Sequence, residues 1–214
     1  ATFGRGGHTA AILGALGPDG RVIAIDRDPS AIEYGRQRFG AEPRLTLIRG
    51  SFGRLEELVR AAGVDDGLQG VLLDLGVSSP QLDDASRGFS FMRDGPLDMR
   101  MNTDESMTAA SWLASAEMHE IRDVLRRYGE EKYAHQIACA IVRVRVDNPL
   151  ETTSQLVKII DDAVPRKDRG KHNATRAFQA IRIRINRELE EIAGALPAAL
   201  EALCDQGRLV AISF

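Results

Sequence analysis

Residues 21–26 read Arg-Val-Ile-Ala-Ile-Asp, and Asp28-Pro29 stands two positions beyond them. A short, continuous apolar run suits a strand that is buried on both faces of a parallel sheet. Asp28 as N-cap, with Pro29 at the first helical position, indicates that a helix starts directly after this strand. The stretch therefore predicts one strand–helix unit of an α/β fold.

The same alternation recurs on both sides of this unit. Further strands are expected at 44–49 and 70–75, and helices at 7–16, 29–39 and 54–62. Alternating strands and helices predict a doubly wound parallel sheet with right-handed crossovers.

The alternation stops after the third strand. Residues 76–101 are rich in Gly, Pro and Asp without periodicity, and so long a loop in a compact domain is usually functional. The next stretch looks all-helical, with helices expected at 108–115, 117–127, 130–146 and 152–163.

A return to the sheet is expected after the helical stretch. The 3–4 spacing of apolar residues predicts one long helix over 174–196, with Asn173 as its N-cap. A second helix should start at Pro197, and an apolar strand closes the chain. We therefore predict a sheet domain of residues 1–101 and 174–214, with a helical insertion domain of residues 102–173.

Composition excludes several classes of protein. With 214 residues, 43% hydrophobic and 28% charged, the chain has globular values and no apolar run long enough to span a membrane. Its two cysteines, Cys139 and Cys204, are far apart, which argues against a disulfide scaffold and indicates a reducing, cytoplasmic location. The chain starts without Met and ends within a strand, so we expect missing sequence at both ends.

The net charge of -3 hides an uneven distribution. Residues 163–187 hold eight Lys or Arg and one acid, a local charge of +7, whereas the rest of the chain has 20 basic and 30 acidic residues. A basic segment of this kind is the electrostatic footprint expected of an RNA contact. The alternative is a solvated run of charge.

A glycine-rich loop, Gly4-Arg5-Gly6-Gly7-His8, precedes the first predicted helix. Glycines let a backbone approach a ligand, and Asp26, nineteen residues beyond Gly7, stands where an α/β nucleotide fold places the acid that binds ribose. The dinucleotide pattern G-x-G-x-x-G fails because Thr9 replaces its third glycine, which favours an adenosine ligand such as S-adenosylmethionine over NAD. Phe52, at the end of the 44–49 strand, either stacks on adenine or belongs to the core.

The most specific motif runs from Asp74 to Asp83. Asp74 closes an apolar strand, so its carboxylate should emerge at the ligand-binding edge. A carboxylate there can accept the proton of an exocyclic amine and make it nucleophilic. Methylation of a pyrimidine carbon would need a cysteine nucleophile instead, and neither cysteine is expected near this edge.

This motif continues through Arg87-Gly88-Phe89-Ser90-Phe91-Met92 and Gly95-Pro96-Leu97-Asp98-Met99-Arg100-Met101. Together with Thr2 to His8 and Ala24 to Asp28, it resembles the bacterial 16S ribosomal RNA cytosine-N4 methyltransferase family, over nearly the whole chain. The resemblance implies a class I methyltransferase, with a Rossmann-like doubly wound sheet and an inserted helical domain. It also implies a substrate, the N4 amine of one cytosine in the decoding region of small-subunit rRNA, and S-adenosylmethionine as cofactor.

The resemblance implies site residues position by position. The cofactor contacts it implies are Gly6, Gly7, His8, Asp26, Phe52, Asp74 and Gln81. Asp74 is also the candidate catalytic residue, and no metal motif appears. Two alternatives to this enzyme are a nicotinamide-dependent oxidoreductase and a non-catalytic RNA-binding factor that keeps the cofactor fold.

Further residues are candidates for contacts with the RNA. Gln179 and Asn186, seven residues apart on the predicted long helix, should share one face and are candidates for reading the cytosine edge. Phe89 or Phe91 is a candidate for stacking on the unstacked base. The basic residues proposed to bind RNA phosphates are Arg166, Lys167, Arg169, Lys171 and Arg176.

Overall fold

The computed structural model describes residues 2–64, 66–165 and 172–213. It divides into two compact units, which are described separately. The sheet unit comprises Ala1–Ser78 and Glu188–Phe214, and the helical unit comprises Ser79–Arg187.

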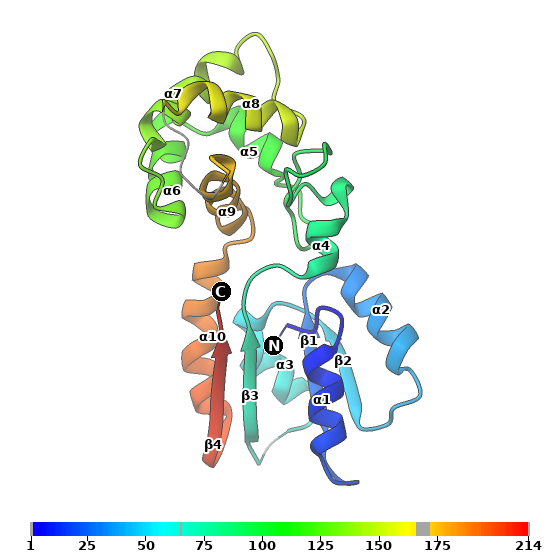
Figure 1. The fold of residues 1–214 in the computed structure, drawn as a ribbon. Coiled ribbons are helices and arrows are strands. Elements are labelled where there is room, and N and C mark those ends of the chain that lie inside the picture. The colour runs from blue at the N-terminus through cyan, green and yellow to red at the C-terminus, as the bar shows by residue number, and fades with distance from the viewer. Residues whose placement is uncertain (1, 65, 166–171, 214) are drawn as a thin grey trace. The chain divides into compact units, whose positions relative to one another are not determined.

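Strands and helices alternate in the sheet unit, as the sequence predicts (Figure 1). Its elements are α1 (Gly7–Ala15), β1 (Val22–Asp26), α2 (Pro29–Phe39), β2 (Leu45–Arg49), the 3-10 turn η1 (Phe52–Arg54), α3 (Leu55–Ala61), β3 (Leu68–Asp74), α10 (Glu188–Ala202) and β4 (Leu203–Ile212). β1 pairs with β2 and β3 pairs with β4, and both pairs are parallel. The fold class is therefore α/β.

The helix after β1 starts as predicted. Asp28 is the N-cap of α2, where its side chain accepts a 2.9 Å hydrogen bond from Ser30 N, and Pro29 occupies the first helical position. This cap satisfies one of the donors that a helix start leaves unpaired.

A short amino-terminal segment lies between the two strand pairs. Phe3 N donates to Ile25 O of β1 at 3.1 Å, and the Thr2 hydroxyl donates to the carbonyl of Asp74 at the end of β3. These bonds connect the carboxyl ends of β1 and β3, the edge where ligands bind in open α/β folds.

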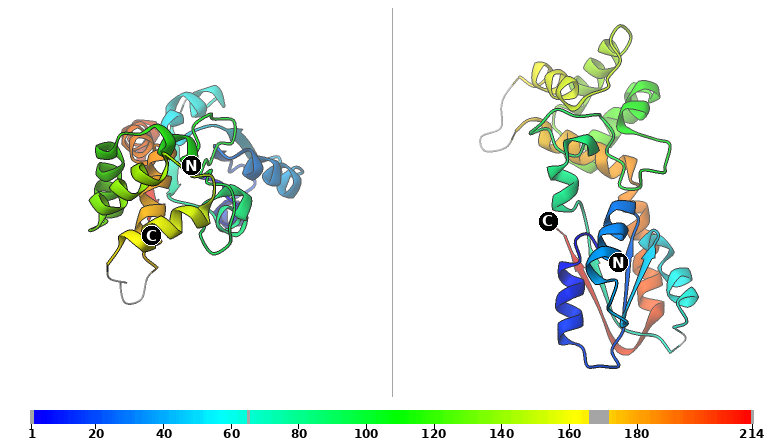
Figure 2. Two further views of the ribbon diagram at one scale, coloured as in Figure 1. Left: turned by 90° about the horizontal axis from the view of Figure 1, so that it is seen from above. Right: turned by 90° about the vertical axis from the view of Figure 1, so that its right-hand side faces the viewer.

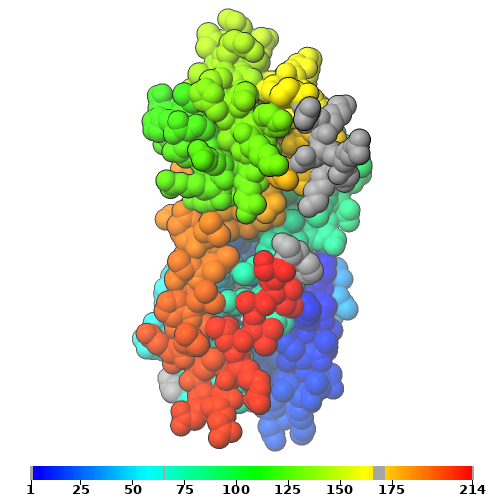
Figure 3. All heavy atoms as spheres, turned by 60° about the vertical axis from the view of Figure 1, so that its left-hand side comes forward, coloured from blue at the N-terminus to red at the C-terminus, as the bar shows by residue number. Residues whose placement is uncertain are grey.

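Apolar side chains from β1, β3 and the neighbouring helices form the core of the sheet unit. Ile25, Leu73 and Leu55 are 2%, 0% and 3% exposed and belong to one cluster with Val59, Val71 and Ala199. The helix α10 (orange) lies beside α3 (cyan) in Figure 2 and beside β4 (red) in Figure 3. In α10 the buried residues are Ala195 and Ala199.

The helical unit follows the predicted helices closely after residue 108. Its elements are α4 (Ser79–Asp83), the 3-10 turn η2 (Ala85–Arg87), α5 (Ala109–Ser115), α6 (Met118–Gly129), α7 (Ala134–Val144), α8 (Thr153–Ala163) and α9 (Ala174–Ile185). Capping boxes at Thr108 and Thr152 start α5 and α8, close to the boundaries expected from the sequence. Within the stretch expected to be a loop, α4 and η2 are short helices that sequence periodicity did not indicate.

The single helix predicted over 174–196 is wrong. α9 ends at Ile185, Arg187 has a φ of +50°, and α10 starts at Glu188. A residue in the left-handed region cannot continue a right-handed helix, so the helix is interrupted there. The helix start expected at Pro197 is also wrong, because Pro197 lies inside α10. Packing of α10 on α3, η1 and β4 compensates for the lost N–H bond.

Asn173 is the N-cap residue of α9, as predicted, but its side chain does not cap the helix. Asn173 makes no capping bond, since its Nδ2 donates instead to Asp161 Oδ1 at 3.0 Å. The ring of His172 replaces it, because His172 Nδ1 accepts a 3.1 Å bond from Ala174 N.

The two compact units divide the chain at other positions than the predicted domains. Residues 79–101 and 174–187 belong to the helical unit by packing, although the sequence placed them with the sheet. The division into a methyltransferase domain and an insertion remains a functional prediction. Among the helices of the described residues, none has the length and apolar character needed to cross a membrane.

Leu73→Ala is expected to destabilise the protein by about 2–5 kcal/mol, because the deleted atoms leave a cavity in the core. Urea denaturation followed by circular dichroism measures this loss. Leu200→Ala is the matched control, since Leu200 is 63% exposed, and its effect should be well below that of Leu73→Ala. Equal losses for the two variants would contradict the core described above.

Candidate cofactor and catalytic site

The glycine-rich loop leads directly into α1. Gly6 has a φ of +69°, and a Cβ at this position would lie 2.7 Å from the ring of Phe3, so the position requires glycine. Gly7, the first residue of α1, is exposed, and a Cβ there would meet no atom of the described residues within 4 Å. The start of α1 therefore faces open space, where its N–H groups favour a polar ligand.

Asp26 binds this loop through its side chain. Its Oδ2 accepts hydrogen bonds from Phe3 N at 3.1 Å and Gly4 N at 2.8 Å, and its Oδ1 accepts one from Asp28 N at 2.9 Å. In the described part of the chain Oδ1 thus accepts one bond, which leaves it capacity for a further donor such as a ribose hydroxyl.

Burial dominates the electrostatics of Asp26, whose residue is 9% exposed. Desolvation raises the pKa of the Asp26 carboxyl above its ordinary value of 3.8, and the negative charge of Asp28 acts in the same direction. The bonds from Gly4, Asp28 and Phe3 oppose this shift without cancelling it.

Asp74 and His8 meet at the same end of the sheet unit. His8 lies in the first turn of α1, and its Nε2 is 3.5 Å from Asp74 Oδ2 at the end of β3. The side chains of His8 and Asp74 are 54% and 33% exposed, so a ligand can reach both. Two polar groups that the sequence placed separately are thus neighbours.

Phe52 lies in η1, directly after β2. Gly50 N donates to Asp26 O at 2.9 Å, which holds the start of this loop next to the end of β1. The ring of Phe52 is half-buried, so it is neither a core residue nor a fully exposed one.

Gln81 belongs to the helical unit. It lies in the short helix α4 and is 7% exposed. The sheet unit brings together the Gly6-Gly7-His8 loop, Asp26, Phe52 and Asp74, whereas Gln81 is described with the other unit.

The two candidates for reading cytosine have different environments. Gln179 is exposed on α9, whereas Asn186 is 1% exposed and follows the end of that helix. Asn186 Nδ2 donates to Met99 O at 2.7 Å and to Arg182 O at 2.9 Å, and its Oδ1 accepts from Met101 N at 2.7 Å. The amide of Asn186 therefore has a structural role, because it ties residues 99–101 of the long loop to the end of α9.

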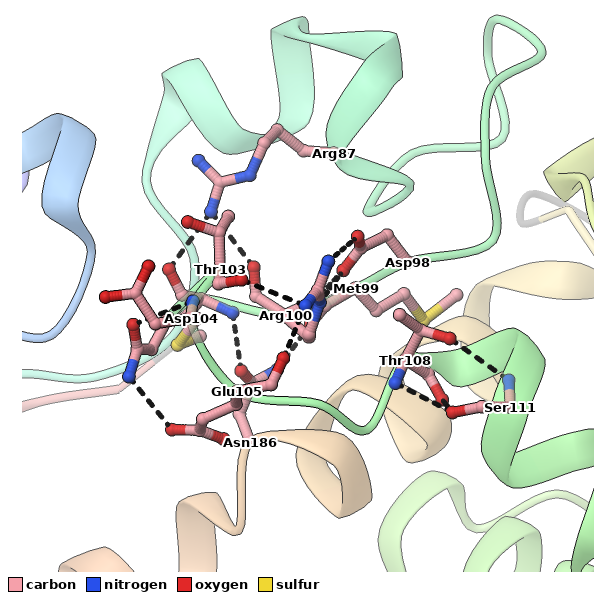
Figure 4. Close-up of polar contacts among 12 residues, drawn as sticks. Arg87, Asp98, Met99, Arg100, Thr103, Asp104, Glu105, Thr108, Ser111 and Asn186 are labelled. Atoms are coloured by element: carbon pink, nitrogen blue, oxygen red, sulfur yellow. Dashed lines mark hydrogen bonds and ion pairs between the residues drawn. The ribbon is translucent and has the colours of Figure 1, made fainter.

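The same loop is fixed by arginines (Figure 4). Arg100 forms an ion pair with Asp98 at 2.6 Å and donates to the carbonyls of Thr103 and Glu105. Arg87 donates to the carbonyls of Arg100 and Met101 at 2.9 and 3.1 Å. The long Gly- and Asp-rich segment is thus an ordered part of the helical unit.

The aromatic candidates for stacking on a base are also part of this unit. Phe89 is 6% exposed and belongs to its core. The Phe91 ring packs 4.8 Å from the ring of His172 and 5.2 Å from that of Phe178.

Most of the predicted RNA contacts lie outside the described residues, namely Arg166, Lys167, Arg169 and Lys171. Arg176 is described and lies half-buried in α9. Among the described residues no group of three His, Cys, Asp or Glu side chains is arranged to hold a metal ion.

Two further residues of this site were not predicted from the sequence. The Thr2 hydroxyl bonds the carbonyl of Asp74, and the Glu191 carboxylate bonds the loop that carries Phe52. Neither has a local sequence signal, because each contact joins segments that are far apart in the chain.

Comparison with known proteins places this site in a family. The model of the MraW methylase family matches residues 1–214. The ribosomal RNA small subunit methyltransferase H of Alteromonas mediterranea is 58% identical over 214 residues, which are 100% of this chain and 68% of that protein. The proteins of the same name from Chromohalobacter salexigens and Bordetella avium are 54% and 51% identical, and this chain covers 64% and 60% of their lengths. The chain, which thus spans about two thirds of these curated relatives, belongs to the MraW methylase family.

Proposed function

We propose that this chain forms part of an enzyme that methylates the N4 amine of a specific cytosine in the decoding region of 16S rRNA. The relatives named above are ribosomal RNA small subunit methyltransferases, which supports the reaction class and the substrate class. The observation that carries the proposal is the position of Asp74, at the carboxyl end of β3 and 3.5 Å from His8 of the glycine loop.

The residues of the sheet unit fit S-adenosylmethionine. Open space beside Gly7 leaves room at the start of α1, and Oδ1 of Asp26 has capacity for a ribose hydroxyl. The half-buried ring of Phe52 suits the adenine, and His8 and Asp74 supply polar groups for the methionine end. The family resemblance adds Gln81 as a further proposed cofactor contact. When bound, this cofactor supplies an electrophilic methyl group on a sulfonium sulfur.

The Asp74 carboxylate acts on the substrate amine. The lone pair of a cytosine N4 amine is delocalised into the ring, so a hydrogen bond from N4–H to Asp74 makes the nitrogen more nucleophilic. As N4 bonds to the methyl group, the methyl–sulfur bond breaks, and the proton that N4 loses passes to Asp74. His8 beside Asp74 keeps the carboxylate oriented at the site.

Amine chemistry is also favoured by where the cysteines lie. Cys204 is at the amino end of β4, whose register pairs Leu203 with Leu68 and Ile212 with Asp74. Cys204 therefore lies at the opposite end of the strand pair from Asp74. Cys139 belongs to the helical unit. Methylation at carbon needs a thiolate nucleophile at the reacting base, and the sheet unit offers none at Asp74.

The proposed fold is a class I methyltransferase sheet, residues 1–101 and 174–214, with residues 102–173 as a helical insertion. The basic stretch 163–187 contacts rRNA phosphates, so binding should weaken with salt. The target cytosine leaves its stack to reach Asp74. This substrate fits the cytoplasmic location that the cysteine content indicates.

The experiment that tests the reaction is mass analysis of small-subunit rRNA from cells that lack the gene. We expect loss of one N4-methylcytosine and its return when the full-length gene is supplied. An unchanged level of this nucleoside would refute the reaction and favour a non-catalytic RNA-binding factor.

Asp26→Ala is expected to weaken S-adenosylmethionine binding by more than about tenfold, because a ribose hydroxyl loses a charged acceptor. Wild-type affinity should also fall as the pH is lowered, since protonation removes the same acceptor. Burial raises the Asp26 pKa, so this fall starts above the ordinary carboxyl range. Isothermal titration calorimetry measures both effects.

Asp19→Ala is the matched control for this prediction, because Asp19 is exposed in the turn before β1, at the opposite end of the strand. Its affinity should match the wild type. Unchanged affinity in Asp26→Ala would show that Asp26 serves the loop alone.

Asp74→Ala is expected to lower turnover by roughly 100-fold, with a smaller change in cofactor affinity, because it removes the proton acceptor. Single-turnover methylation of small-subunit rRNA by the full-length enzyme, together with calorimetry, separates the two effects. Asp205→Ala, exposed in β4, is the control. If affinity falls more than turnover, Asp74 belongs to cofactor binding only.

A further inference from the structure

A carboxylate from α10 reaches the loop that carries Phe52. Glu191 Oε2 accepts a 3.0 Å hydrogen bond from Gly53 N and a second one from the Ser51 hydroxyl. Ser51 is also the N-cap of η1, and its oxygen accepts from Gly53 N at 3.2 Å. Glu191 therefore binds the residue before Phe52 and the residue after it.

Gly53 lets α10 come this close to η1. A Cβ on Gly53 would lie 3.1 Å from Cδ of Glu191 and closer still to Oε2, so a side chain there displaces the carboxylate. One turn further along α10, a Cβ on Gly194 would be 3.6 Å from Gly53 O. The backbones of α10 and the loop thus approach each other closely, so Glu191 can reach the Ser51 hydroxyl and Gly53 N.

The helix dipole does not explain this contact. Glu188, Glu190 and Glu191 all lie in the first turn of α10, where the dipole stabilises any carboxylate. Glu190 is exposed, whereas Glu191 is half-buried and directed at two donors. Bonds to a charged acceptor are stronger than neutral ones, so this contact restrains the loop.

The loop is held at its other end as well. Gly50 N donates to Asp26 O at 2.9 Å, which ties the start of the loop to β1. Phe52 lies between these two attachments, so its backbone is restrained on both sides. Restraining a binding residue before the ligand arrives lowers the entropy cost of binding.

We propose that Glu191 is a positioning residue, which presets Phe52 against the adenine of the cofactor through Ser51 and Gly53. This inference rests on the proposed function, because it requires that the sheet unit binds S-adenosylmethionine. It adds a residue from α10 to a site otherwise built from the first strands and the glycine loop.

A double-mutant cycle tests the proposal. Calorimetry with S-adenosylmethionine compares the wild type, Glu191→Ala, Phe52→Ala and the double variant. We expect Glu191→Ala to weaken binding about five- to tenfold in the wild-type background and to have almost no effect in Phe52→Ala. Glu190→Ala, in the same helical turn, is the matched control and should bind as the wild type does.

Thermal melting of the same variants separates positioning from stability. A merely structural Glu191 would lower the melting temperature and cofactor affinity equally in both backgrounds, and such additive losses would overturn the proposal. Glu191→Gln keeps an oxygen that accepts from Gly53 N, so it should recover part of the affinity.

Gly53→Ala gives a second, independent test, because its Cβ displaces the Glu191 carboxylate. It should weaken binding as much as Glu191→Ala does, and combining the two should cause little further loss. If the wild type binds and the Glu191 variants bind equally well, the inference fails while the proposed function stands. If the wild type does not bind S-adenosylmethionine, both fail.

Discussion

The carboxylate of Asp26 joins three parts of the sheet unit through backbone N–H groups. It accepts bonds from Phe3 and Gly4 of the amino-terminal loop and from Asp28 at the start of α2. Burying a carboxylate costs free energy unless hydrogen-bond donors surround it. These bonds therefore stabilise the charge of Asp26 and also hold the loop in place. The position of Gly6 and Gly7, and with them His8 beside Asp74, depends on this one side chain.

The site therefore combines a rigid frame with open ligand positions. The frame consists of bonds that the protein makes with itself, at Asp26, at Asp74 through Thr2, and at the Phe52 loop through Glu191. The open positions are the start of α1 and the exposed faces of His8 and Asp74. A ligand that binds there meets groups already held in place, which is the arrangement that electrostatic catalysis requires.

Local signals in the sequence were sufficient for much of the fold. Asp28-Pro29 predicted the start of α2, and the helix starts expected near residues 108 and 152 coincide with capping boxes at Thr108 and Thr152. The break between α9 and α10 was not predictable, because it depends on Asn186 bonding to Met99 and Met101 across the fold. The contact of His8 with Asp74 and that of Glu191 with Gly53 both depend on tertiary packing, so no local pattern predicted them.

The order in which the chain builds the sheet unit has a consequence for its synthesis. The Ser51–Glu191 bond joins residues 140 positions apart, and β3 finds its partner β4 only after the whole helical unit has been made. Contacts so distant in sequence slow folding, and β3 exposes an unpaired edge until they form. During translation the helical unit can fold first, since its residues are contiguous. The half of the molecule that holds Asp26 and Asp74 can therefore complete its sheet only after β4 has left the ribosome.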